Sequence, residues 1–91
     1  MRANMIKMKS GCAYSNNLEE IDMIYITGCQ EEGFFPKATL YDFLKTNPES
    51  IQVNIYPYPN LQPIVSSNGE KYVRSKPDST GLDNLLNLPR Y

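Results

Sequence analysis

The chain of 91 residues contains no histidine and no tryptophan, and the missing histidine restricts its chemistry most. Without histidine there is no Ser-His-Asp or Cys-His arrangement and no imidazole general base. With only Cys12 and Cys29, a tetrahedral structural zinc site is strongly disfavoured, and free thiols are expected. The glycines are isolated and form no phosphate-binding loop. We therefore expect a protein that is not an enzyme and that uses no metal or cofactor.

The sequence also lacks long apolar runs and a strong net charge. No stretch approaches the ~20 apolar residues of a membrane-spanning helix, and charged residues interrupt the N-terminus where a signal peptide needs an apolar segment. A net charge of −1 gives no overall attraction to nucleic acid or to an acidic membrane. We expect a cytoplasmic protein, in a bacterium or an infected host, with no membrane contact and no sequence-specific nucleic-acid binding.

The small size of the chain limits its hydrophobic core. A chain of this length buries only about 60% of the surface that its unfolded form exposes, and self-association enlarges such a core. We therefore expect a homo-oligomer. Turn-forming residues follow the mixed apolar and basic start of the chain. This pattern predicts a weakly ordered or docking extension over residues 1–19 and a single domain over residues 20–91.

Two elements have strong local signals. Ile21–Thr27 is nearly continuous in apolar and β-branched residues, which predicts an inner strand covered on both faces. Lys37–Thr46 is predicted to be a helix, because Leu40, Phe43 and Leu44 fall on one helical face. Thr39 with Asp42 resembles a capping box at its start, and the residue before Pro48 ends it.

The second half of the chain predicts strands and a hairpin. Ile51–Tyr56 alternates apolar and polar residues, as a half-buried strand does. Asn68-Gly69 between two strand-like runs predicts a type I′ turn, with Val65 opposite Tyr72. Asp83 or Asn84 then caps a short helical turn. The fold class that follows is α+β, in the order β-α-β-β-β, with a mainly antiparallel sheet of about four strands, one packed helix and a short C-terminal helical turn.

The end of the chain carries a family resemblance. Tyr72-Val73-Arg74-Ser75, Asp78-Ser79-Thr80 and Asp83-Asn84-Leu85-Leu86-Asn87-Leu88-Pro89 together resemble the ending of a family of short bacterial and phage proteins known only as a domain of unknown function. The resemblance implies no catalytic residues. It implies a bacterial or mobile-element origin.

One candidate ligand site follows from the predicted hairpin. Tyr72, Arg74 and Lys76 share a strand face that leads to Ser79 and Thr80. An aromatic ring stacks on a base, cations hold phosphate, and free N–H groups at a helix start favour anions. A nucleotide-sized anion would suit this set. The alternative is an exposed strand face whose charges protect a sheet edge.

Two further groups are candidate interface residues. Tyr56 and Tyr58 alternate with prolines at a predicted sheet edge, and tyrosine supplies a large contact area at low entropy cost. Leu85 and Leu86 either plug the core, which is the favoured interpretation, or form a partner surface. Carboxylates in the first third of the chain lie too close together in sequence to converge readily on a metal ion, so solvated surface is favoured for them; they are Glu19, Glu20, Asp22, Glu31 and Glu32.

These observations favour a non-enzymatic binding protein. Its most specific form is a phage or mobile-element counter-defence protein that sequesters a nucleotide-type signalling molecule as a homo-oligomer. The alternative is a protein–protein interaction module, or an inhibitor, that binds a host protein through its tyrosine- and proline-containing edge. A carboxylate-dependent hydrolase is the third and weakest hypothesis.

Overall fold

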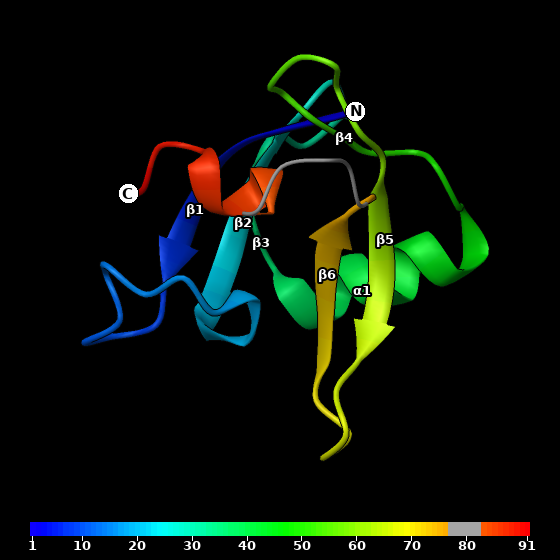
Figure 1. Ribbon diagram of the computed structural model, residues 1–91. Coiled ribbons are helices and arrows are strands. Elements are labelled where there is room, and N and C mark those ends of the chain that lie inside the picture. The colour runs from blue at the N-terminus through cyan, green and yellow to red at the C-terminus, as the bar shows by residue number, and fades with distance from the viewer. Residues whose placement is uncertain (77–82) are drawn as a thin grey trace.

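The computed structural model describes residues 1–76 and 83–91 and confirms an α+β fold (Figure 1). Its elements are β1 (Arg2–Met8), η1 (Leu18–Glu20), β2 (Ile21–Thr27), β3 (Gly33–Pro36), α1 (Lys37–Thr46), β4 (Gln52–Val53), β5 (Leu61–Val65), β6 (Lys71–Ser75) and η2 (Asn84–Asn87). A four-stranded sheet has the order β3-β2-β1-β4, and β5 pairs with β6 in a second sheet. Helix α1 packs against both β5 and β6. No helix in the described residues is long and apolar enough to cross a membrane.

Strand β1 is an inner strand, in contrast to the weakly ordered extension expected over residues 1–19. It pairs with β2 along its length and with β4 on its other side. Ala3 and Ile6 are completely buried in the core. Two register shifts, at Ala3/Met5 and Lys7/Met8, break the regular alternation of core-facing residues. This irregularity explains why a period of two does not reveal the strand in the sequence.

The C-terminus completes the sheet beside β1 (Figure 1). The Ile6 N–H donates to the Pro89 carbonyl at 3.0 Å, and the Tyr91 N–H donates to the Ile6 carbonyl at 2.9 Å. The Arg90 guanidinium donates to the carbonyls of Ala13, Ser15 and Leu86. The last three residues therefore fix both β1 and the loop that follows it.

Helix α1 has the predicted bounds, with Leu40 and Leu44 buried in the core. The predicted capping box is wrong. The helix begins at Lys37, so Thr39 lies inside its first turn and cannot be the N-cap. The N-cap is Pro36, which makes no side-chain capping bond. The Asn47 N–H donates to the Phe43 carbonyl at the other end.

The hairpin lies where it was predicted, but its turn and register differ. The Ser66 N–H donates to the Glu70 carbonyl, and the Gly69 N–H donates to the Ser66 carbonyl. This pattern is a three-residue loop in which only Gly69 has a positive φ, whereas a type I′ turn also needs one at Asn68. The register shifts by one residue, so Tyr72 lies opposite Ile64 instead of Val65.

The strand predicted over Ile51–Tyr56 is shorter in the structure. Only Gln52–Val53 forms β4, and the chain turns away afterwards through a hydrogen bond from the Tyr58 N–H to the Ile55 carbonyl. Ile51 and Val53 are buried as the alternation predicted.

Asp83 anchors the C-terminal segment to β6. Its carboxylate accepts hydrogen bonds from the Ser75 hydroxyl at 2.9 Å, from the Ser75 N–H at 3.2 Å and from the Leu85 N–H at 2.9 Å. Asp83 is thus the N-cap of η2, one of the two residues predicted for that role. The anchor holds Leu85 and Leu86 in the core, where both are buried.

Replacement of Asp83 by alanine tests this anchor. We expect Asp83→Ala to lower the free energy of unfolding by about 2 kcal/mol, because buried donors on Ser75 lose their acceptor and η2 loses its cap. Urea denaturation at pH 7 measures the change. Asp22→Ala is the matched control, since Asp22 is exposed on β2. Equal unfolding midpoints for the two variants would contradict the role of Asp83.

Candidate functional site

Two of the predicted ligand residues share one face of β6. Tyr72 and Arg74 are both half-buried, on the face opposite to the buried Val73. Strand β6 contacts η1, η2 and α1. The Nε of Arg74 is buried and has no hydrogen-bond partner among the residues that the structure describes. Two further predicted ligand residues, Ser79 and Thr80, lie outside the described residues.

Lys76, the remaining predicted ligand residue, lines a different feature. It is exposed and lines a surface groove with Asn60 and Gln62, and its N–H donates to the Asn60 carbonyl at 2.8 Å. Neither Tyr72 nor Arg74 lines this groove. Tyr72 and Arg74 thus share a face of β6, whereas Lys76 follows the end of the strand and lines the groove with Gln62, the residue that pairs with Arg74 across the hairpin.

An aromatic patch projects from the loop between β4 and β5. Tyr56 is 82% exposed and Tyr58 is 44% exposed, and their rings meet edge-to-face with centroids 6.0 Å apart. The Cζ of Arg2 lies 4.2 Å from the centroid of the Tyr58 ring. These three residues are the Tyr56–Tyr58 patch. Arg2 is its unpredicted member, because no local sequence signal connects it to a loop more than fifty residues away.

The backbone of this patch is held in an unusual conformation. Tyr58 has a φ of +61°, in the left-handed region that residues with a Cβ rarely adopt. Such a conformation costs about 1–3 kcal/mol and persists where surrounding contacts impose it. Here the Tyr58 N–H donates to the Ile55 carbonyl at 2.7 Å, and the Pro59 carbonyl accepts from the Val53 N–H at 2.9 Å. Tyr58 is therefore displayed on an ordered loop.

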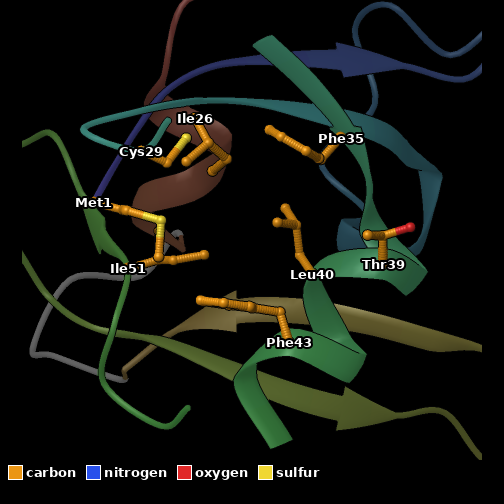
Figure 2. Close-up of a pocket in the computed structure, with 8 residues that line it drawn as sticks. All are labelled: Met1, Ile26, Cys29, Phe35, Thr39, Leu40, Phe43 and Ile51. Atoms are coloured by element: carbon orange, nitrogen blue, oxygen red, sulfur yellow. The ribbon is translucent and has the colours of Figure 1, made fainter. Parts of the chain in front are cut away.

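A pocket lies between the four-stranded sheet and α1 (Figure 2). Its volume is about 170 Å³, and its walls include Met1, Ile26, Cys29, Leu40 and Phe43. All of the pocket surface is apolar. Cys29 is a free thiol and donates a long hydrogen bond of 3.5 Å to the Glu31 carbonyl. Among the described residues, no charged side chain lines the pocket to orient a polar ligand.

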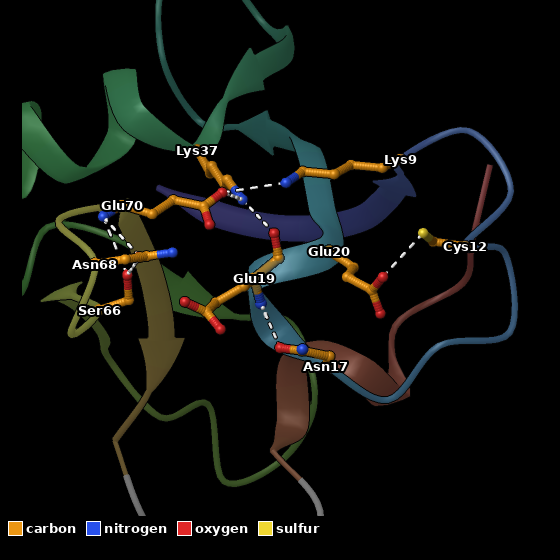
Figure 3. Close-up of polar contacts among 9 residues, drawn as sticks. All are labelled: Lys9, Cys12, Asn17, Glu19, Glu20, Lys37, Ser66, Asn68 and Glu70. Carbon is orange, nitrogen blue, oxygen red and sulfur yellow. Dashed lines mark hydrogen bonds and ion pairs between the residues drawn. The ribbon is translucent and has the colours of Figure 1, made fainter.

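Three charged side chains meet in the Lys9–Lys37–Glu70 cluster, of which Lys37 is the buried member (Figure 3). The Lys37 Nζ lies 2.6 Å from the Glu70 Oε1 and also donates to the Glu19 carbonyl, while the Lys9 Nζ lies 3.1 Å from the same Glu70 oxygen. Lys37 is 8% exposed. The hydrogen bonds from Lys37 and then Lys9 lower the pKa of Glu70 below its ordinary value. Both lysines pair with the same carboxylate, and these contacts connect the hairpin to α1, to η1 and to the end of β1.

The other cysteine is held in an unreactive form. The Cys12 thiol donates to the Glu20 Oε2 at 3.0 Å (Figure 3). The Ser15 hydroxyl bonds to the other oxygen of the same carboxylate. The hydrogen bond to Glu20 raises the pKa of Cys12, so the thiol stays protonated and is a weak nucleophile. Both cysteines are free, as expected.

The acidic residues in the first third of the chain do not form a metal site in the described structure. Glu20 binds Cys12 and Ser15, and Glu32 accepts from the Gly28 N–H at 2.8 Å. Nowhere in residues 1–76 and 83–91 do three acidic or cysteine side chains come together in a way that could hold a metal ion.

Residues 56–89 match a protein family described as "Protein of unknown function (DUF3892)". The match begins at the Tyr56–Tyr58 loop and covers the hairpin and η2, but it spans less than half of the chain. This part of the chain is therefore similar to a conserved domain of unknown function. No curated protein and no solved structure matches the chain.

The lowered pKa of Glu70 predicts a pH dependence of stability. A carboxylate with a lowered folded-state pKa stabilises the fold fully above its unfolded pKa of about 4.3, and this contribution is lost as the pH falls through the folded pKa. We expect Glu70→Gln to be less stable than the wild type at pH 7 and to lose less stability below about pH 4.3. Urea denaturation between pH 3 and pH 7 measures both effects.

The control for this experiment is Glu31→Gln, because Glu31 is exposed. Its stability should follow the wild-type curve across the whole pH range. A Glu70→Gln curve that runs parallel to the wild type would show that Glu70 does not carry the expected pH dependence.

Proposed function

We propose that this protein is a non-enzymatic binding module that contacts a partner protein through the Tyr56–Tyr58 patch. The observation that carries the proposal is the display of two exposed tyrosine rings, in mutual contact, beside the Arg2 guanidinium. Tyrosine and arginine are enriched among the residues that dominate the binding energy of protein interfaces.

The fixed conformation of the Tyr56–Tyr58 patch is a second reason to expect that it binds a partner. A side chain that is already fixed before binding loses less conformational entropy when it meets a partner. Tyr58 is fixed by its backbone and by Arg2, and Tyr56 packs against Tyr58. Both tyrosines also belong to the segment that is similar to the conserved domain of unknown function.

Affinity capture with matched variants tests this function. We expect immobilised wild-type protein to retain one stoichiometric protein from a bacterial lysate, and the isolated complex to weaken about thirtyfold or more on Tyr56→Ala or Tyr58→Ala, as for a residue worth about 2 kcal/mol. Biolayer interferometry measures the affinity. Tyr14→Ala is the control, because Tyr14 is 96% exposed and lies outside the patch. Equal binding by the Tyr56→Ala, Tyr58→Ala and Tyr14→Ala variants would rule out the patch.

Arg74 supports a second candidate function, the binding of a small anionic nucleotide on the Tyr72 face of β6. Its buried Nε has no partner within the described residues, and an arginine N–H is a donor suited to phosphate. In its most specific form, this candidate is a phage or mobile-element protein that counters host defence by sequestering a nucleotide signal as a homo-oligomer.

Thermal denaturation with cyclic and ADP-ribose-type nucleotides tests the second candidate. We expect one of them to raise the melting temperature by about 10 °C or more at a concentration 100 times its dissociation constant. Arg74→Ala should abolish the shift, and Arg2→Ala, which removes an arginine elsewhere, should keep it. The absence of any shift, or an undiminished shift in Arg74→Ala, counts against nucleotide binding.

A further inference from the structure

A polar groove along β5 has a composition that neither proposed function uses. It is lined by Pro48 and Glu49, which follow α1, by residues of β5, and by Asn60 and Lys76. Its volume is about 440 Å³, within the range of about 300–1,000 Å³ that is common for small-molecule sites. Polar and apolar atoms contribute to its walls in similar amounts.

The groove holds two opposite charges that do not neutralise each other. The Glu49 Oε2 accepts a hydrogen bond from the Asn60 Nδ2 at 3.2 Å, while the Lys76 N–H donates to the Asn60 carbonyl at 2.8 Å. Glu49 is therefore hydrogen-bonded to the side chain of Asn60, and Lys76 to its backbone. The ion pairs found among the described residues include neither Glu49 nor Lys76. The groove is thus lined by the Glu49 carboxylate, which the Asn60 side-chain amide holds, and by the exposed Lys76, whose backbone N–H is bonded to the Asn60 carbonyl.

The position of Glu49 is imposed by its neighbours. Its φ is +64°, in the left-handed region that a residue with a Cβ rarely adopts. The Gln52 Nε2 donates both to the Glu49 carbonyl at 2.8 Å and to the Asn60 Oδ1 at 2.9 Å. This amide network fixes the carboxylate before any ligand arrives, which lowers the entropic cost of binding.

The free edge of β5 argues against a partner strand as the occupant. In an antiparallel hairpin, hydrogen-bonded and non-hydrogen-bonded residue pairs alternate. Ser66 and Glu70 form a hydrogen-bonded pair, so Val65 and Pro63 belong to non-hydrogen-bonded pairs and their backbone groups point away from β6. Pro63 has no N–H to donate, and a proline at such a position opposes the addition of a strand. The side chains of the groove are therefore its main means of recognition.

We propose that this groove binds a small zwitterion, a molecule that carries a primary ammonium and a carboxylate. The ammonium pairs with Glu49 and the carboxylate with Lys76. The apolar part of the ligand lies against the Pro48 and Pro63 rings and Ile64. This ligand class complements both charges at once, whereas a simple anion or cation would leave one of them unmatched.

Titration of the full chain with amino acids of increasing length tests the proposal. The probes are glycine, β-alanine, 4-aminobutanoate and 6-aminohexanoate, followed by ¹H–¹⁵N NMR. We expect at least one of them to give saturable shifts at the amides of Asn60, Gln62 and Ile64. N-acetylation or amidation of that probe should weaken binding at least tenfold, because each removes one of the two charges.

Charge-removing variants complete the test. Glu49→Gln and Lys76→Gln should each weaken binding of that probe at least tenfold, and both residues are exposed, so the fold should persist. Glu31→Gln and Lys45→Gln are matched controls on exposed residues that do not line the groove, and they should bind as the wild type does. The proposal is overturned by no saturable shift with any probe, by equal binding of the blocked probes, or by unchanged binding in Glu49→Gln and Lys76→Gln.

Discussion

The pairing of β1 on both of its sides is the constraint on which the rest of the structure depends. One side is occupied by β2, and the other is divided between β4 and the C-terminal residues. A strand surrounded in this way has its backbone groups satisfied and its apolar residues covered. It also brings three distant parts of the chain together, including the start of the loop that displays Tyr56 and Tyr58, since Arg2 pairs with Gln52 and contacts Tyr58.

Polar contacts then position the second sheet. The Lys9–Lys37–Glu70 cluster fastens one end of the hairpin to α1 and β1, and the Asp83 carboxylate fastens the other end to η2. Removing one partner of a buried ion pair or hydrogen bond is costly, because the remaining group stays desolvated and unpaired. In a chain with a small core, these few contacts therefore determine how the hairpin sits. The Tyr72 face belongs to that hairpin, and so do the residues of β5 that line the groove.

Local signals predicted part of this arrangement and missed the rest for identifiable reasons. The helix, the inner strand β2 and the exposed tyrosine loop all follow from periodicity, β-branched residues and prolines. The hairpin was placed correctly, but Asn68-Gly69 is compatible with two loop lengths, and only the fold selects between them. Strand β3 was missed because Gly33–Pro36 is short and ends in proline. The contact of Arg2 with Tyr58 and that of Glu49 with Asn60 are made by tertiary structure, which leaves no pattern in the sequence.

The amino-acid sequence by itself determined the fold class, the main helix and the residue types available for chemistry, because these depend on neighbours within one or two turns of the chain. Tertiary structure decided which of those residues meet. It buried Leu85 and Leu86, brought Arg2 against the Tyr58 ring and placed Lys76 in the groove beside Asn60. The physical reason is that strand pairing and charge pairing act between segments far apart in sequence, so their outcome depends on the packing of the whole chain.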